Sequence, residues 1–292
     1  MVISEQLLEM WASAPDDKPA QEAYRQIQEA VSKSPELQSK TIEVYLQGSY
    51  RNRTHIKQNS DVDVVVELQS TFSPDTKALP PEDKRLFDST HSDATYHFSD
   101  LRRDVELSLI RYFGEKNVDF GNKAITVTGN QGRSTADVIP CLEHRKYTSN
   151  KYDKKSYIPG IKFYTRRENI EIINWPKVHY KNGAAKNDRT KTMYKALVRI
   201  CKNYRDFLVA EGHLVVGISP SYFLECLVYN VPDNQFDSTY NVSLKGVTSY
   251  LKQANLNGFC CVNEQDYLFE SSKGWDISKA RDFINWMEVL TR

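Results

Sequence analysis

The chain lacks any long apolar stretch. No segment approaches the roughly 18 consecutive apolar residues of a membrane-spanning helix, and Met1–Glu5 lacks the basic start of a secretory signal. At 40% hydrophobic and 26% charged, the 292 residues have the composition of a soluble globular protein. We therefore expect a cytoplasmic protein that folds as one bilobal unit or two modest domains.

Cysteine, histidine and net charge are also in short supply. The five cysteines show no zinc spacing, because the adjacent pair Cys260–Cys261 has no second pair to complete a tetrahedral site, and their odd number fits a reducing compartment. The six histidines show no close pairing that indicates zinc or a Ser-His-Asp triad. A net charge of +1 weakly favours mononucleotide substrates, since proteins that track long nucleic acids are usually more basic.

What the chain does have is a glycine turn followed by two aspartates that open a β-branched run. Gly48-Ser49 follows a short predicted strand, and Asp61-Val62-Asp63 begins a valine-rich segment. Side chains at i and i+2 of a strand leave the same face, so Asp61 and Asp63 point the same way with Cα atoms roughly 6.5 Å apart. That spacing suits a pair of divalent ions, and magnesium prefers carboxylate and phosphate oxygens.

A third carboxylate is expected, because two aspartates leave two metal ions under-coordinated. Asp137 is the best candidate, since it stands at the head of another short β-branched run. Each feature alone has an ordinary explanation: a solvated strand end for Asp-x-Asp, a plain turn for Gly-Ser and a strand-edge carboxylate for Asp137. Their combination favours a catalytic site, and two like charges on one strand face favour a cation between them.

These residues resemble the DNA polymerase β-like nucleotidyltransferase superfamily, which combines a Gly-Ser turn, an Asp-x-Asp strand and a distant third aspartate. Further segments, Tyr157–Tyr164, Ile173–Gly183 with its Asn-Trp-Pro-Lys stretch, and Lys195–Lys202, are similar to the bacterial cGAS/DncV-like nucleotidyltransferases, most closely to their E clade. The resemblance covers about residues 40–230. It implies an α+β, bilobal fold, with a mixed-sheet lobe at 1–160, a helical lobe at 161–292 and an active-site cleft between them.

The family makes cyclic di- and trinucleotide second messengers for antiphage defence. The resemblance therefore implies a template-independent synthase that joins nucleoside triphosphates, with UTP and ATP favoured, and releases pyrophosphate. It implies two Mg²⁺ ions, or Mn²⁺ in their place, held by Asp61, Asp63 and Asp137, with Gly48 and Ser49 on the donor's terminal phosphates. It also implies a separate effector protein that senses the product, and neither a membrane nor a nucleic-acid template.

A predicted helix at 187–211 carries a basic stripe of Lys195, Arg199 and Lys202 opposite its apolar face. On its own, such a stripe is equally well explained as a solvated face, but a triphosphate needs cations beyond its magnesium. The resemblance assigns the triphosphate tail to Lys202, with Arg199 one turn earlier. Lys195 is an equally good candidate by geometry.

The segment Ser219-Pro220-Ser221-Tyr222 predicts the start of the next helix, with Ser219 as N-cap. By resemblance, Ser221 contacts the triphosphate and Tyr222 stacks on a nucleobase. Otherwise these are an ordinary first-turn residue and a half-buried core tyrosine. Asn174 offers the donor and acceptor that uracil requires, and the resemblance associates an asparagine here with a pyrimidine. Its ordinary role would be to close a hairpin end.

Hydrophobic periodicity and turn signals predict a mixed lobe followed by helices. Helices are expected at 3–13, 19–32, 99–114, 187–211, 220–230, 241–255 and 277–291, and strands at 41–46, 61–68, 124–128, 134–139, 158–164 and 170–174. The proline-containing residues 70–92 are expected to form a loop, and the basic residues 145–156 an exposed connector.

Three other functions stay open. An RNA-end-extending nucleotidyltransferase of the CCA-adding or poly(A) type would share the motif, but no basic RNA-binding tail is visible. A catalytically silent nucleotide-binding regulator would not need all three carboxylates. A scaffold or toxin–antitoxin module would use the fold mainly to bind a partner.

Overall fold

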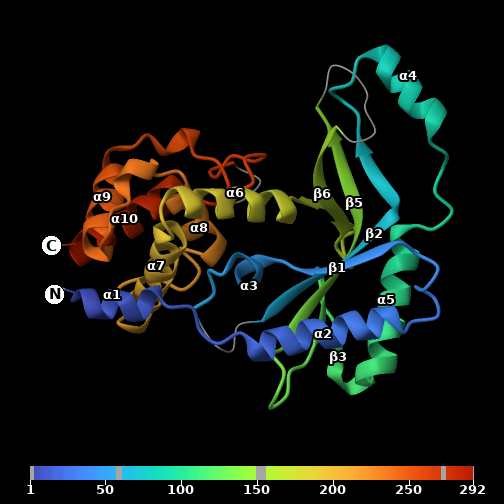
Figure 1. The fold of residues 1–292 in the computed structure, drawn as a ribbon, viewed down its shortest axis with the longest axis horizontal. Helices are drawn as coiled ribbons and strands as arrows, with labels where there is room; N and C mark the ends of the chain where they lie inside the picture. The colour runs from blue at the N-terminus through green and yellow to red at the C-terminus, as the bar shows by residue number, and fades with distance from the viewer. Residues whose placement is uncertain (1–2, 57–60, 149–155, 271–273, 292) are drawn as a thin grey trace. The chain divides into compact units, whose positions relative to one another are not determined.

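The computed structural model describes residues 3–56, 61–148, 156–270 and 274–291 (Figure 1). The chain forms two compact units. The helical unit comprises residues 1–15, 51–58 and 179–292, and the α/β unit comprises residues 16–50 and 59–178. The segment around 51–58 thus belongs to the helical unit although α/β segments precede and follow it. The division at residue 160 stays a prediction for the functional domains.

The α/β unit is built on a mixed sheet, of which seven strands lie in the described residues. Five strands follow one another in space, with β6 added to the edge of β5 and β7 added to β6. Among these pairs β2 and β5 run parallel, and the others run antiparallel. The strands in spatial order are β1 (Ile42–Leu46), β2 (Val62–Asp75), β5 (Ala136–Tyr147), β4 (Ile125–Val127) and β3 (Val118–Phe120), and then β6 (Tyr157–Tyr164) and β7 (Glu171–Asn174).

Helices α2 (Lys18–Ser32) and α5 (Phe98–Phe113) run alongside this sheet (Figure 1). Alternate residues of β2, such as Val64, pack with Leu101 and Ile27 of these helices into a buried cluster. Because strand side chains alternate in direction, Val65 packs in a second cluster on the opposite face. Asp63, two residues before Val65, belongs to that second face.

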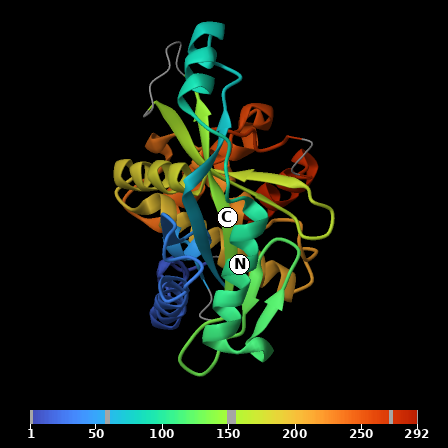
Figure 2. The same cartoon turned by 90° about the vertical axis from the view of Figure 1, so that its right-hand side faces the viewer.

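The loop expected at 70–92 is wrong. β2 continues to Asp75 after a register shift between Leu68 and Phe72, and α4 (Pro81–Thr90) follows it beyond the end of the sheet opposite to α5 (Figure 2). The prolines were misleading because proline is well tolerated in the first turn of a helix. Aromatic contacts hold α4 in place, with Phe87 packed edge-on against Phe72 and Tyr147.

The expected connector at 145–156 is also wrong in part. β5 continues to Tyr147 and β6 begins at Tyr157, so the sheet uses both ends of that range, while 149–155 lies outside the described residues. Arg145 looked like a solvated cation in the sequence. It instead packs over the Phe72 ring and pairs with Glu143, so its charge is satisfied within the sheet.

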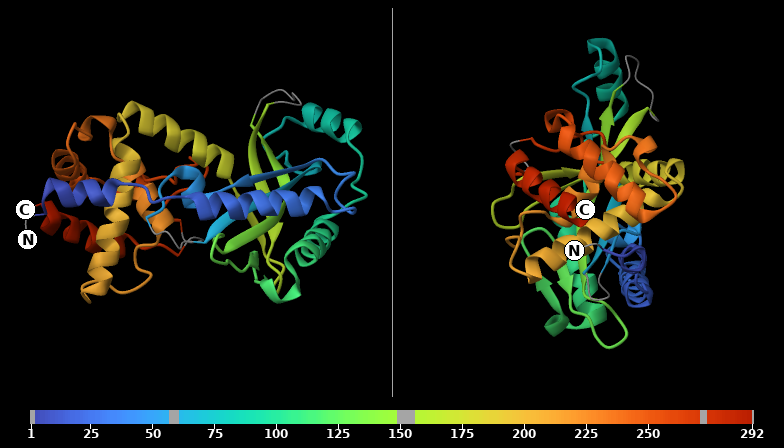
Figure 3. Two further views of the ribbon diagram at one scale, coloured as in Figure 1. Left: turned by 60° about the horizontal axis from the view of Figure 1, so that its bottom comes forward. Right: turned by 90° about the vertical axis from the view of Figure 1, so that its left-hand side faces the viewer.

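The helical unit packs its helices around one apolar core (Figure 3). Leu8 of α1, Leu197 of α7 and Phe283 of α10 are among its fully buried members. Its helices are α1 (Glu5–Ala12), α7 (Met193–Ala210), α8 (Ser221–Tyr229), α9 (Tyr240–Gln253) and α10 (Ile277–Thr291). Elsewhere in the two units, the described residues also form α3 (Gly48–Asn52), α6 (Pro176–Arg189) and the 3₁₀ turns Glu115–Asn117, Asp233–Gln235 and Leu256–Gly258. No helix in the described ranges is both long and apolar enough to cross a membrane.

Two details of the expected helices are wrong. The single helix at 187–211 is divided between α6 and α7, because Lys191 and Thr192 take left-handed φ values of +50° and +73°. Ser219 is not the N-cap of α8, since Pro220 holds that position. The Ser219 hydroxyl is instead buried and has no hydrogen-bond partner among the described residues.

Candidate active site

The sheet itself brings two of the predicted carboxylates together. Asp63 on β2 and Asp137 on β5 are register partners in the parallel pair. Direct neighbours on adjacent strands have their side chains on one face, so both carboxylates leave the same side of the sheet. A 3.0 Å hydrogen bond from Val62 N to Thr135 O ties the two strands at this level. Asp61 immediately precedes β2 and is exposed.

The backbone at Gly48 leaves room for the Asp63 carboxylate. Gly48 has φ = +64°, and a Cβ added there would lie only 2.3 Å from Asp63 Oδ2. Gln47 N donates a 2.9 Å hydrogen bond to Asp63 O, which ties the chain before the glycine to β2. Gly48, the glycine of the predicted turn, is the first residue of α3, so Ser49 lies in a short helix next to the carboxylates. Contact of Gly48 and Ser49 with phosphate stays a prediction.

The aspartates oppose one another's ionisation. Burial, followed by the charges of Asp137 and Asp61, raises the pKa of Asp63 from 3.8 to about 6. Burial and the charge of Asp137 also raise the pKa of Asp61. The ionised carboxylates are therefore unfavourable in this arrangement unless a positive charge joins them.

Magnesium fits the donor chemistry of Asp61, Asp63 and Asp137. Carboxylate oxygens are the hard ligands that Mg²⁺ prefers, and a divalent cation relieves their mutual repulsion. Within the described ranges no three His, Cys, Asp or Glu side chains already form a complete metal-holding group. Mg²⁺ usually takes one or two carboxylates and completes its shell with water and substrate phosphates. A site that the substrate completes remains a prediction for these three residues.

Thr126 is a neighbour of the site that the sequence did not single out. It is the register partner of Asp137 on β4, and its Oγ1 donates a 2.7 Å hydrogen bond to Asp137 Oδ1. One carboxylate oxygen of Asp137 is thereby oriented by the protein. The alternating pattern at 124–128 predicted the strand, but nothing local indicated which residue it would face.

The stretch from Asn174 to Lys177 joins β7 to α6. Asn174 is exposed at the end of β7. Lys177 Nζ lies 2.7 Å from Glu43 Oε2 and 3.0 Å from Glu67 Oε1, and Glu67 is buried. The motif lysine therefore fastens this stretch to β1 and β2. Trp175 packs so closely on Gly160 that a Cβ there would lie 2.8 Å from the indole ring.

The start of α8 carries two further predicted residues. Ser221 is exposed in the first turn, and Arg205 Nη2 lies 3.5 Å from its Oγ. Tyr222 is 37% exposed, with ring centroids 5.3 Å from His179 and 5.7 Å from Trp275. The Tyr222 ring is accessible, and stacking on a base stays a prediction. Arg205 is a cation that the sequence pattern did not single out.

The basic stripe of α7 is not a solvated face. Lys202 is only 2% exposed, and its Nζ donates a 2.9 Å hydrogen bond to Thr54 O. Arg199 donates to the backbone carbonyls of Ala12 and Arg53. Burial lowers the pKa of both Lys202 and Arg199. Both cations thus have internal partners, and their contact with a triphosphate stays a prediction.

Lys195 differs from the other two cations of α7. It is half-buried, and its Nζ lies 5.7 Å from the centroid of the Tyr180 ring. Arg51 packs on the same ring at 4.1 Å, so two cations flank Tyr180 in the helical unit. Arg51 was not among the predicted residues, because its neighbours in the sequence give no sign of this ring.

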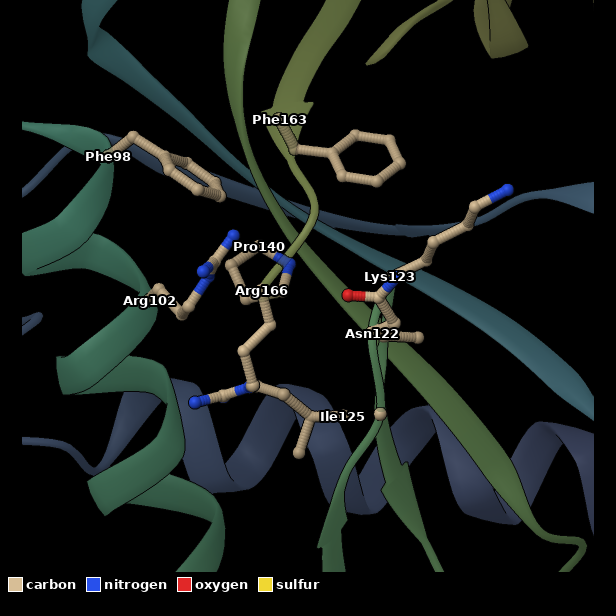
Figure 4. A pocket seen from close by; sticks show the side chains of 10 residues that line it. Phe98, Arg102, Asn122, Lys123, Ile125, Pro140, Phe163 and Arg166 are labelled. Carbon is tan, nitrogen blue, oxygen red and sulfur yellow. The ribbon is translucent and has the colours of Figure 1, made fainter. Parts of the chain in front are cut away.

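A shallow recess elsewhere in the α/β unit contains none of the candidate residues. It lies among the start of α5, residues 121–125 and β6, and Figure 4 shows Arg102 and Arg166 at its wall. Arg102 donates to Tyr164 O, and Arg166 pairs with Glu106. Because both guanidinium groups already have internal partners, we assign no part of the active site to this recess.

Comparison with known proteins finds one family model for each of the two units. The family model for the C-terminal helical domain of cGAS/DncV-like nucleotidyltransferases matches residues 181–291. The model for a nucleotidyltransferase domain matches residues 25–133.

Relatives match over nearly the full length. A cyclic UMP-AMP synthase from Rhodothermus marinus is 40% identical over 99% of this chain and 98% of its own. The structure of that organism's CdnE c-UMP-AMP synthase with Apcpp and Upnpp superposes with a TM-score of 0.90, covering 99% of this chain and 96% of the other. A cyclic dipurine nucleotide synthase from Elizabethkingia meningoseptica is 38% identical over 93% of this chain and 92% of its own. The chain belongs to the cGAS/DncV-like nucleotidyltransferases and, within them, to the CdnE group.

Proposed function

We propose that this nucleotidyltransferase makes a cyclic dinucleotide from two nucleoside triphosphates, without a template, and releases pyrophosphate. The observation that carries the proposal is the register pairing of Asp63 with Asp137 beside Gly48. That arrangement supplies a carboxylate pair and a backbone turn, the two features that phosphoryl transfer from a triphosphate needs. The full-length similarity to named cyclic nucleotide synthases supports the same activity.

The chemistry consists of two successive attacks. A ribose hydroxyl of the acceptor attacks the α-phosphorus of the donor, a P–O bond to that phosphorus forms, and the bond to the departing pyrophosphate breaks. Asp137, oriented by Thr126, accepts the proton of the attacking hydroxyl. When bound, Mg²⁺ lowers the pKa of that hydroxyl and neutralises charge on the pyrophosphate. The linear intermediate then rebinds in the opposite sense, and a second attack closes the ring.

The other candidate residues bind and orient the nucleotides. Ser49 and Ser221 are suited to hold phosphate oxygens, and Tyr222 to stack on a base. Lys195 is better suited than Lys202 to the triphosphate tail, because Lys202 already donates to an internal carbonyl. Asn174 is suited to the O4 and N3–H of uracil, and this favours UTP with ATP as substrates. In the cell the product would act on a separate effector in antiphage defence.

Incubation of the pure protein with labelled ATP, GTP, CTP and UTP plus Mg²⁺ tests the proposal. We expect a small product that resists phosphatase, together with pyrophosphate release that Asp61→Asn, Asp63→Asn and Asp137→Asn each abolish while the protein stays folded. Added RNA serves as the control for end extension. Extension of that RNA, or normal pyrophosphate release by an aspartate variant, would overturn the proposal.

A further inference from the structure

A buried ionic cluster in the helical unit joins Lys202 to side chains that have no role assigned above. Glu225 of α8 is 3% exposed, and its Oε1 lies 2.9 Å from His179 Nε2. Its Oε2 accepts a 3.0 Å hydrogen bond from Thr54 Oγ1 and lies 3.8 Å from Lys202 Nζ. Lys202 in turn donates to Thr54 O, so the backbone and the side chain of Thr54 are both held.

The cluster is charged and well satisfied. Burial alone would raise the pKa of Glu225, but His179, Lys202 and Thr54 hold the pKa of this carboxyl at about 2. Tyr194 OH also donates to the backbone carbonyl of Glu225 at 3.2 Å. A buried ion pair contributes little net stability compared with apolar residues of the same shape. Its presence here is better explained by what it positions than by what it stabilises.

The cluster holds one particular segment of the chain. Residues 51–58 belong to the helical unit, whereas residues 16–50 and 59–178 belong to the α/β unit. In the sequence, Thr54 stands five residues after Ser49 and seven before Asp61. Arg199 also donates to Arg53 O, so consecutive carbonyls at 53 and 54 are bound by cations of α7. Residues 53 and 54, which follow the Gly48–Ser49 turn in the chain, are thus anchored on α7 and α8.

We propose that Glu225 and Thr54 are positioning residues that set the placement of the Gly48–Ser49 turn relative to the catalytic aspartates. This inference rests on the proposed function and deepens it. Ser49 and Thr54 are separated only by the remainder of α3 and one further residue, so a shift of the anchored segment moves the turn. A displacement of about 1 Å at a phosphate-holding group can cost roughly 100-fold in rate.

The sharpest test compares two threonine-to-valine variants of equal shape. Thr54→Val removes the hydroxyl that donates a hydrogen bond to Glu225. The matched control is Thr248→Val, because both threonines are buried in the helical unit (0% and 2% exposed). Thr248 Oγ1 has no hydrogen-bond partner in the described part, so its loss breaks no such contact. Initial rates of pyrophosphate release are measured well below each melting temperature. We expect kcat to fall at least tenfold for Thr54→Val and less than twofold for Thr248→Val, with little change in KM for either. Equal kcat values would overturn the proposal.

A second variant separates positioning from simple loss of stability. Glu225→Gln keeps the shape of the side chain and removes its charge. If the two residues act as one unit, the double variant Thr54→Val/Glu225→Gln should be no slower than the slower single variant. Independent, multiplying losses would contradict the proposal. Amide exchange at residues 51–56 should accelerate in both single variants and stay unchanged in Thr248→Val. Inactive wild-type protein would instead refute the proposed function, so the two failures are distinguishable.

Discussion

Asp63 and Asp137 are register partners across the parallel pair of β2 and β5, so their approach is set by backbone hydrogen bonds and not by rotamer choice. The sheet therefore builds in a repulsion that the protein alone does not relieve. Burial together with that repulsion raises the pKa of Asp63 to about 6. The arrangement is tolerable because a cation and a substrate are expected to join it.

The first prediction concerns the pH dependence of stability without metal. Because the pKa of Asp63 is raised from 3.8 to about 6, the folded state holds a proton in this window that the unfolded state releases. The free energy of unfolding should fall as the pH rises from about 4 to about 6 and then level off. The cost at neutral pH is on the order of 3 kcal/mol. In EDTA, Asp63→Asn should be more stable than wild type at pH 7.5, by urea denaturation, and the difference should shrink toward pH 4.

Magnesium supplies the control for that prediction. Addition of Mg²⁺ should raise the melting temperature of the wild type and leave Asp63→Asn nearly unchanged, because the variant has less charge to neutralise. Asp61→Asn should gain less stability than Asp63→Asn, since Asp61 is exposed. A wild-type protein that becomes steadily more stable between pH 4 and pH 6 in EDTA, relative to Asp63→Asn, would contradict the assignment.

The second prediction concerns the glycine beside Asp63. Gly48→Ala should abolish activity, because the new Cβ would lie 2.3 Å from Asp63 Oδ2 at a residue with φ = +64°. Gly212→Ala is the matched control, since Gly212 has φ = +73° and a Cβ there meets nothing within 4 Å. Both variants carry a similar left-handed backbone cost of roughly 1 kcal/mol. Comparable loss of pyrophosphate release in the two would show that backbone strain alone accounts for the effect at Gly48.

Local pattern was enough to predict the catalytic strands but not their partners. The alternation from Asp61 to Asp63 follows from the two-residue period of a strand, and β1, β4, β6 and β7 appear close to the expected ranges. Asp137 could be named because it stands at the head of a β-branched run. Which residues face it depends on pairing between segments far apart in sequence, so Thr126 could not be named. The extension of β2 to Asp75 was hidden by Pro74, because proline is tolerated only at certain positions of a strand.

In the helical unit, periodicity predicted the apolar core but not the buried charged pair. The apolar face predicted for this helix is indeed buried, with Leu197 and Leu208 in the core, but the same periodicity put Lys202 on the polar face. A lysine is buried only where a partner offsets its desolvation, and that partner, Glu225, lies on another helix. Periodicity on one helix contains no information about such a pair. The same limit applies to His179, which contacts Glu225 although the histidine spacing gave no sign of a partner.

The third prediction separates two lysines of α7. Lys195→Met should keep its fold and raise KM for the triphosphates about tenfold or more, because a charge-assisted contact is worth roughly 1.5–3 kcal/mol. Lys202→Met should instead lose about 3–5 kcal/mol of stability, since it removes a buried partner of Glu225. Urea midpoints and steady-state kinetics measured on both variants distinguish the roles. If Lys202→Met folds as well as wild type and only KM rises, Lys202 is the triphosphate ligand after all.

The last prediction concerns base selection by Asn174. Its side chain is exposed at the end of β7, and the Lys177 contacts with Glu43 and Glu67 hold the neighbouring stretch firmly. A carboxamide can pair with both the acceptor and the donor edge of uracil, so Asn174→Ala should lower kcat/KM for UTP about tenfold or more and that for ATP much less. Asn122→Ala, at an asparagine of the same unit that lines the recess of Figure 4, is the control and should alter neither. Because hydrogen bonding and not bulk is the proposed cause, Asn174→Leu should lower kcat/KM for UTP by about as much as Asn174→Ala does. A variant whose kcat/KM falls equally for ATP and UTP would place Asn174 in general nucleotide binding instead.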